Sequence, residues 1–170
     1  MKTIIEKAAL IRLVIFDVDG VLTDGSLYIG ENGQEFKAFY ARDGLGLKML
    51  QSTGVVIGII TAKISSIVTH RMQALGIKHV YQGAQDKLIA FKQLCEKLQL
   101  QPQQVAYVGD DVNDVPVMLQ VGLAIACADA HFLVIKHAHW QTKAAGGRGA
   151  AREVCDLIMQ AQGTMVNCEL

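Results

Sequence analysis

The sequence has few cysteines, and they are far apart. Its 170 residues include four, Cys95, Cys127, Cys155 and Cys168, and no two of them form a Cys-x-x-Cys pair. This spacing argues against a zinc cluster and does not suggest a disulfide framework. We therefore expect reduced thiols at all four positions.

The sequence also lacks an excess of charge of either sign. Sixteen basic residues balance sixteen acidic ones, so no overall field draws the chain to nucleic acid or to an anionic membrane, and we expect neither as a partner. The apolar run of residues 8–16 is interrupted by Arg12 and ends at Asp17, which makes it too short for a membrane span. It lacks a small-residue cleavage site, so we expect a cytoplasmic protein.

Apolar material is plentiful, at 51% of the residues, and the length suits a single domain over residues 1–170. Strand-like runs alternate with helical ones, which predicts an α/β fold with a Rossmann-like, doubly wound parallel sheet. We expect strands at 11–17, 55–60, 78–81, 105–108 and 123–126, with a sixth at 132–135. Helices are expected at 1–9, 43–52 (capped by Asp43), 65–75, 86–98 (opened by Asp86), 113–120 and 149–162.

Residues 20–40 do not have a helical pattern. Two strand-like runs, 26–29 and 34–39, flank Asn32 and Gly33, and this arrangement predicts a β-hairpin flap over about 25–40. The spacings from Gly20 to Thr61 and from Thr61 to Lys87 leave no room for a cap domain. We expect flaps of neighbouring subunits to cover the site instead, packing through the apolar residues Leu27, Tyr28, Ile29, Phe36, Phe39 and Tyr40.

Carboxylates follow the first predicted strand at once. Asp17 and Asp19 lie two apart on an extended segment, so both side chains share one face, which is costly unless a cation or a proton relieves the repulsion. Other strand ends deliver further polar residues to the same edge of the sheet: Thr61, Lys63, Asp110, Asp111 and Asp114. Mg²⁺ prefers such oxygen ligands and binds through one or two carboxylates plus substrate phosphate.

Four motifs, DVDGVLTDG, ITAK, DK and GDDVNDVP, occur in the order in which haloacid dehalogenase-like phosphatases carry them, and the chain resembles the subclass without a cap domain. TDGSLYIGENGQEFKAFYARDGLGLKML and KAAGGRGAARE resemble more closely the 3-deoxy-D-manno-octulosonate 8-phosphate phosphatases. That resemblance implies a homotetrameric hydrolase of lipopolysaccharide precursor biosynthesis. It would use Mg²⁺ and an aspartyl-phosphate intermediate to release phosphate from this sugar acid.

The resemblance also implies roles for individual residues. Asp17 would be the nucleophile and Asp19 the general acid and base. Thr61 would bind a phosphoryl oxygen, and Lys87 would offset the charge of phosphate and Asp17. Mg²⁺ would be held by Asp17, the Asp19 carbonyl and Asp110, with Asp114 or Asp111 supporting through water. Capping of the helix that begins near residue 113 is the alternative for both Asp111 and Asp114.

Residues 40–44 match the sugar-binding segment of the family. The substrate-binding residues implied are Asp19, Tyr40, Ala41, Arg42, Asp43, Gly44, Lys63, Arg71 and Lys87. Arg42 could instead pair with Asp43 or Glu35, and Arg71 could be a surface arginine. His131, His137 and His139 are expected to face solvent or an interface rather than a metal.

The chain departs from the family at Thr61-Ala62-Lys63, where Thr-Gly-Arg is usual. An ammonium in place of a guanidinium loses bidentate recognition, which leaves a nine-carbon 3-deoxy-nonulosonate 9-phosphate open as the substrate. A non-catalytic oligomerisation domain of this fold is a further alternative. We expect a flexible segment over about 142–170, whose glycine-rich residues 146–149 either reach a neighbouring active site or form a plain linker.

Overall fold

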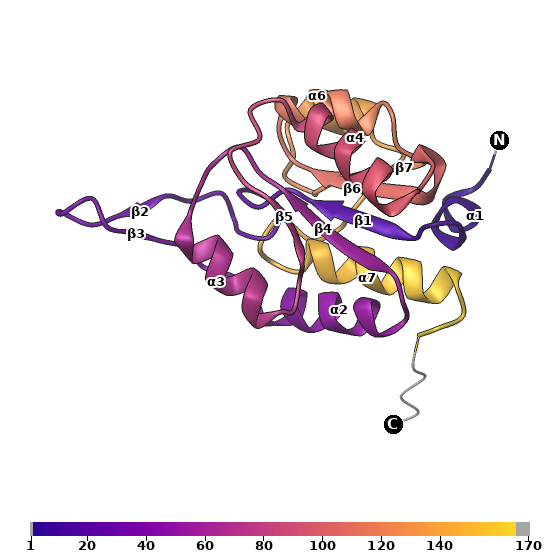
Figure 1. Cartoon of the computed structure of the whole chain (residues 1–170), viewed down its shortest axis with the longest axis horizontal. Helices are drawn as coiled ribbons and strands as arrows, with labels where there is room; N and C mark the ends of the chain where they lie inside the picture. Colours follow the sequence, from indigo (N-terminus) through magenta and orange to yellow (C-terminus); the bar gives the residue numbers. More distant parts are fainter. Residues whose placement is uncertain (1, 166–170) are drawn as a thin grey trace.

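The computed structural model describes residues 2–165, and their centre is a six-stranded sheet between two layers of helices (Figure 1). Every pair of neighbouring strands is parallel. In spatial order the strands are β5 (His79–Tyr81), β4 (Val56–Ile60), β1 (Leu13–Phe16), β6 (Val105–Gly109), β7 (Leu123–Ala126) and β8 (Trp140–Gln141). Cys168 lies outside the described residues.

The helices cover both faces of the sheet (Figure 1). One face carries α2 (Ala41–Ser52), α3 (Ser66–Ala74) and α7 (Ala150–Ala161), and the other carries α4 (Lys87–Leu98), α5 (Val115–Met118) and α6 (Phe132–His137). The short α1 (Ile4–Ala9) packs against α7. Because both faces are covered, every residue of β1, β6 and β7 is buried, which explains why these strands are continuous apolar runs in the sequence.

The predicted doubly wound α/β sheet is confirmed, but its sixth strand was placed wrongly. Residues 132–135 belong to α6, and the edge strand is β8 instead. His131 precedes α6, and its Nδ1 accepts a hydrogen bond from the backbone N–H of Leu133, as an N-cap side chain does. The apolar and polar alternation that suggested a strand is too short to distinguish a strand from a six-residue helix.

The two predicted aspartate caps have different outcomes. Asp86 caps α4, and its carboxylate accepts from the N–H of Leu88. The prediction for Asp43 is wrong, because α2 begins two residues earlier, after Tyr40. Asp43 lies in the first turn of α2 and accepts a hydrogen bond from the N–H of Arg152 on α7.

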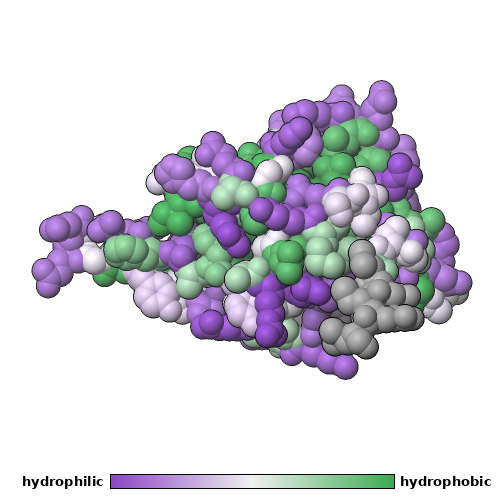
Figure 2. Space-filling model, turned by 90° about the horizontal axis from the view of Figure 1, so that it is seen from below, coloured by the Kyte–Doolittle hydropathy of each residue, from purple (hydrophilic) through white to green (hydrophobic). Residues whose placement is uncertain are grey.

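The predicted hairpin is present as β2 (Tyr28–Ile29) and β3 (Glu35–Phe36), which pair antiparallel. Gly33 turns the chain with a positive φ of 73°, a left-handed conformation that glycine adopts at little cost. The flap projects beyond the body of the molecule in both views (Figures 1 and 2). Its apolar side chains are largely exposed, with Ile29 at 64% and Phe36 at 55%.

The helix expected at 149–162, within the segment expected to be flexible, is present as α7. Six residues of α7 are buried, and α7 packs along α2. Residues 166–170 lie outside the described part of the chain. Within residues 2–165, no helix is both long enough and apolar enough to cross a bilayer.

Candidate active site

The carboxyl ends of β1, β4 and β6 open into one cavity of about 230 Å³. These strands are neighbours in the sheet, so the residues that follow them converge although they are far apart in sequence. The cavity is lined by Asp17, Asp19, Thr61, Ala62, Lys63, Asp110, Asp111 and Asn113. The structure thus brings together the polar residues expected at the ends of these three strands.

A buried lysine lies between two carboxylates, one of which, Asp17, lines this cavity. Lys87 Nζ is 2.7 Å from Asp17 Oδ2 and 2.7 Å from Asp114 Oδ1, and all three side chains are buried. Lys87 is the first residue of α4, where a cation opposes the helix dipole. Burial lowers the pKa of Lys87, but the two carboxylates together outweigh burial and raise it. Lys87 is therefore a charged counter-ion of the acidic cluster.

Asp114 is completely buried, and its carboxylate accepts hydrogen bonds that fix neighbouring residues of the site in place. Its Oδ1 accepts from Lys87 Nζ and, at 2.6 Å, from the hydroxyl of Tyr107. Its Oδ2 accepts from the N–H groups of Asp110 at 3.0 Å and Asp111 at 3.2 Å. A carboxylate has about four lone-pair sites, and four donors occupy them. Asp114 lies close to Asp17 and Asp110, and this arrangement favours a positioning role over direct metal ligation, in keeping with the support through water expected for it.

Asp17 and Asp110 are the two carboxyl groups of the cluster whose charged forms are disfavoured. Burial, followed by the charge of Asp114, raises the pKa of Asp17 to about 6 and that of Asp110 to about 8. Asp110 Oδ1 is buried and has no hydrogen-bond partner among the described residues. Carboxylate oxygens are hard ligands, and a bound cation would favour the ionised forms that burial disfavours here. The two carboxylates, one with an oxygen that lacks a partner, therefore fit a hard divalent cation such as Mg²⁺.

Asp19 has a partner that the sequence did not suggest. Its carboxylate pairs with Lys37, on the return arm of the flap, and the Lys37 side chain is only 3% exposed. Tyr107, the hydroxyl donor to Asp114, is a second residue that was missed. A buried lysine and a tyrosine inside a core strand each imply a nearby partner, but neither residue indicates which one.

Asp111 caps the 3-10 turn Val112–Asp114, as its alternative interpretation expected.

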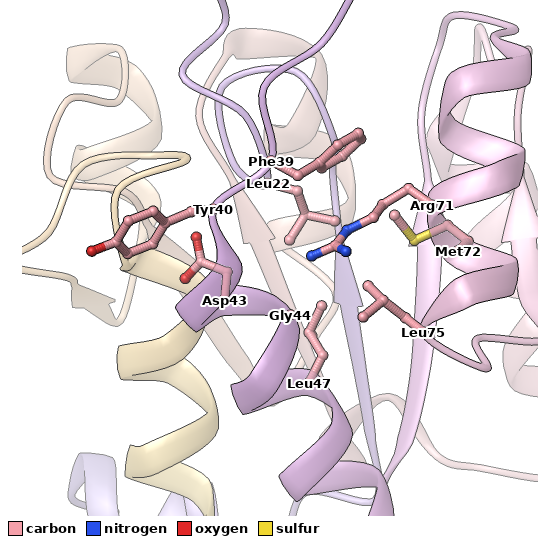
Figure 3. A pocket seen from close by; sticks show the side chains of 9 residues that line it. All are labelled: Leu22, Phe39, Tyr40, Asp43, Gly44, Leu47, Arg71, Met72 and Leu75. Atoms are coloured by element: carbon pink, nitrogen blue, oxygen red, sulfur yellow. The ribbon is translucent and has the colours of Figure 1, made fainter.

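Of the predicted substrate-binding residues, Asp19 and Lys63 line this cavity, whereas residues 40–44 and Arg71 do not. Tyr40, Asp43, Gly44 and Arg71 line a separate small pocket between α2 and α3 (Figure 3). Arg71 reaches from α3 toward α2, and its guanidinium carbon lies 5.6 Å from the centre of the Phe39 ring.

Asp43 turns to the opposite side, toward Tyr40 and α7 (Figure 3). It is 2% exposed, and its Oδ1 accepts from the Arg152 N–H at 2.8 Å. Burial raises the pKa of Asp43. The neighbouring Ala41 and Arg42 are exposed. In this arrangement Asp43 is an anchor for α7, whereas Ala41 and Arg42 are open to a ligand.

Comparisons with known proteins agree with this geometry. A family of haloacid dehalogenase-like hydrolases matches residues 51–154. The 3-deoxy-D-manno-octulosonate 8-phosphate phosphatase of Yersinia pestis is 53% identical over 159 residues, which cover 94% of this chain and 85% of that protein. The Escherichia coli K12 enzyme of the same name is 54% identical over 162 residues, covering 95% and 86%.

Solved structures extend the similarity to three dimensions. The crystal structure of the Yersinia pestis phosphatase has a TM-score of 0.95 and 51% identity, covering 96% of this chain and 89% of that one. The phosphatase of Moraxella catarrhalis, in complex with magnesium ion, phosphate ion and KDO, has a TM-score of 0.92 and 41% identity, covering 94% and 92%. The chain belongs to the haloacid dehalogenase-like hydrolases, within the family of 3-deoxy-D-manno-octulosonate 8-phosphate phosphatases.

Proposed function

We propose that this chain is a Mg²⁺-dependent phosphatase that hydrolyses 3-deoxy-D-manno-octulosonate 8-phosphate to 3-deoxy-D-manno-octulosonate and phosphate, a step of lipopolysaccharide precursor biosynthesis. The observation that carries the proposal is the cluster of Asp17, Asp110 and Lys87 at the edge of the sheet. A chain that is more than half identical to two such phosphatases over nearly its whole length supports the choice of substrate.

The metal would be held by the carboxylates of Asp17 and Asp110 and by the backbone carbonyl of Asp19. When bound, Mg²⁺ neutralises charge on the phosphoryl oxygens. The Oδ1 of Asp110, which finds no donor within residues 2–165, supports this assignment, because a buried acceptor without a donor is unfavourable unless something else binds it. Asp114 keeps the Asp110 loop in place through its two backbone hydrogen bonds.

In the first half of the reaction, a carboxylate oxygen of Asp17 attacks phosphorus. The new O–P bond forms as the bond from phosphorus to the sugar oxygen breaks, and Asp19 gives its proton to that leaving oxygen. In the second half, Asp19 takes a proton from water, whose oxygen attacks the aspartyl-phosphate. Phosphate leaves, and the carboxylate of Asp17 is restored.

The remaining polar residues of the cavity orient the phosphoryl group. Lys87 holds Asp17 at 2.7 Å and offsets the negative charge that gathers there. The hydroxyl of Thr61, which lines the same cavity, would donate to a phosphoryl oxygen. Lys63 is exposed at the cavity and would attract the phosphate as a point charge.

Binding of the sugar acid would require a second copy of the chain. Arg42 and Ala41 are exposed at the start of α2, and Tyr40, Gly44 and Arg71 lie beside them around the small pocket. We propose that flaps of neighbouring subunits cover these residues in a homotetramer. The exposed apolar side chains of the flap support this proposal.

The tetramer is tested by light scattering at micromolar concentration. Ile29→Ser, on the flap, should shift the mass toward smaller species and reduce activity with it. Ile5→Ser removes a comparably exposed apolar side chain on α1 and should leave the mass unchanged. An active wild-type monomer would contradict the proposal.

The catalytic proposal is tested by phosphate release from a panel of sugar phosphates, with Mg²⁺ or EDTA. The eight-carbon acid should be the best substrate, EDTA should abolish turnover, and Asp17→Asn should be inactive. Asp156→Asn, whose carboxylate bonds only Arg152 among the described residues, is the matched control and should retain activity. Activity in Asp17→Asn would refute the nucleophile, and preference for a nine-carbon acid would refute the substrate.

Location in the cytoplasm is part of the same proposal. The thiols of Cys95, Cys127 and Cys155 are free and buried, and burial raises the pKa of each, which keeps them in the unreactive thiol form. Cell fractionation followed by the phosphatase assay tests the location, and activity recovered with the membrane or periplasmic fraction would contradict it.

A further inference from the structure

We propose that Gly146 and Gly147, on the loop before α7, are positioning residues that set the separation of Asp19 from Asp110. The inference rests on the proposed function and adds to it a role for the glycine-rich segment within its own subunit. This segment was expected either to reach a neighbouring active site or to serve as a plain linker. In the structure it packs against the loop that leaves Asp19.

The first observation is that Gly20 is enclosed on two sides. A Cβ added at Gly20 would lie 1.9 Å from Asp110 Oδ2. A Cβ added at Gly146 would lie 1.8 Å from the carbonyl oxygen of Gly20. The Gly20 backbone therefore fills the space between the Asp110 carboxylate and Gly146, and neither contact has room for a methyl group. Asp19 is the residue immediately before Gly20.

Gly147 continues the same contact along the loop. Its N–H donates to the carbonyl of Val21 at 2.9 Å. An added Cβ would lie 2.4 Å from the backbone of Thr23 and Asp24, and the φ of Gly147 is +63°, so a side chain would be both crowded and strained. The two glycines thus pack against the backbone of residues 20–24 too closely for either to carry a Cβ.

The glycine segment is held by residues on both sides of it. The Gly146 N–H donates to Asp129 Oδ1 at 2.9 Å, on the loop after β7. Arg148 forms an ion pair with Asp24 at 2.9 Å, next to the root of the flap. The Arg152 N–H of α7 donates to Asp43 Oδ1, which connects α7 to α2. Since α7 is a packed helix, it provides a fixed support against which the Asp19 loop rests.

A methyl group at Gly146 would therefore displace the Asp19 loop. Moving a Cβ from 1.8 Å to the 3.0 Å that real contacts require separates the two loops by on the order of 1 Å. A misplacement of this size can cost about 10²-fold in rate, because catalytic groups must meet the reacting atoms in a narrow range of distance and direction.

The test is Gly146→Ala in the full chain, compared with Gly122→Ala. Both glycines have an unremarkable φ, and a Cβ at Gly122 would lie 2.2 Å from the carbonyl oxygen of Gln103, an equally severe backbone clash. Gly122 lies immediately before β7, at the amino end of the sheet and away from the cavity. Both variants should lose thermal stability, and only Gly146→Ala should lose catalytic positioning.

At a temperature where circular dichroism shows both variants folded, we expect Gly146→Ala to lower kcat by about 10²-fold. The Mg²⁺ concentration for half-maximal activity should rise, while KM for the sugar phosphate changes less than threefold. Gly122→Ala should retain the kcat of the wild type. Wild-type kcat in folded Gly146→Ala, or the same loss in both variants, would overturn the inference.

A second variant covers the case in which Gly146→Ala does not fold. Arg148→Gln removes an exposed side chain that bonds Asp24, and it introduces no clash. It should lower kcat by about 2- to 5-fold, in line with the loss of one exposed ion pair. An unchanged kcat would count against the inference.

If the wild type itself releases no phosphate, the proposed function has failed. The rise of Tm with Mg²⁺ in the same variants would then still test the positioning of the two loops.

Discussion

The ammonium of Lys37 pairs with the carboxylate of Asp19, so the flap is connected to the loop that carries Asp19 by a charge pair as well as by the chain. Lys37 follows the exposed Phe36 at the end of β3, yet its side chain is buried. A buried ammonium is unfavourable unless a counter-ion accompanies it. The position of the flap root and the direction of the Asp19 side chain therefore depend on one another.

The first prediction is that Lys37→Met lowers kcat by about tenfold or more, because it leaves Asp19 without its partner and releases the flap root. Lys37→Arg keeps the charge and should recover part of the loss. Lys92→Met removes an exposed ammonium on α4 and serves as the control. Steady-state kinetics with the sugar phosphate measure all four proteins. Equal kcat in Lys37→Met and the wild type would show that the pair has no role in turnover.

The second prediction concerns the stability of the metal-free protein. Burial and the charge of Asp114 raise the pKa of Asp110 to about 8 and that of Asp17 to about 6, above the usual 3.8. Between pH 4 and these values the folded state binds more protons than the unfolded state, so the free energy of unfolding falls as pH rises. In EDTA, Tm should decrease from about pH 5 to pH 8.

Asp110→Asn removes the larger of these two effects, so its Tm in EDTA at pH 8 should exceed that of the wild type by about 2–6 °C. Asp156→Asn, at a partly exposed ion pair away from the cavity, should keep the wild-type pH dependence. Differential scanning calorimetry measures both. A Tm for Asp110→Asn below that of the wild type would mean that the charge of Asp110 is already relieved within the chain.

The third prediction is that Mg²⁺ stabilises the protein through the same carboxylates. At a concentration 100 times its Kd, a ligand that binds only the folded state adds about 2.7 kcal/mol, or roughly 5–10 °C for a chain of this size. Asp110→Asn should lose most of this shift, and Asp156→Asn should show it in full. Thermal unfolding with increasing Mg²⁺ is the measurement. The same shift in all three proteins would place the metal elsewhere.

Much of the site could be predicted because its residues come directly after apolar strands. Asp17 and Asp110 follow β1 and β6, and neighbouring parallel strands bring their carboxyl ends to one place. The four hydrogen bonds of Asp114 could not be predicted, because they depend on how Tyr107, Lys87 and two backbone N–H groups pack in three dimensions. The sequence identifies groups that need partners, and long-range packing decides which partners they find.

In the fold, too, local sequence patterns predict some elements, and long-range contacts decide others. Residues 123–126 form the expected strand because a buried apolar run bounded by turns has few alternatives. Residues 132–135 form a helix instead, since a four-residue alternation carries little information and the cap at His131 acts locally. Asp43 resembles a cap in sequence, but its carboxylate bonds the N–H of Arg152, 109 residues away. Such long-range bonds leave no local pattern in the sequence.

The last prediction separates the two roles of Asp43, substrate contact and helix anchor. Its Oδ1 accepts the third N–H of α7, whose own cap residue, Gly149, has no side chain to do so. Asp43→Ala should therefore lower the free energy of unfolding by about 1–2 kcal/mol, the usual cost of losing an N-cap. Asp43→Asn keeps an oxygen at this position and should be close to the wild type in stability, because burial already disfavours the charged form of Asp43.

Urea unfolding measures stability, and KM for the sugar phosphate measures substrate contact. If the side chain anchors α7, the stability of Asp43→Ala falls while KM stays within about threefold; a large rise of KM in Asp43→Asn at unchanged stability would restore Asp43 to the substrate site.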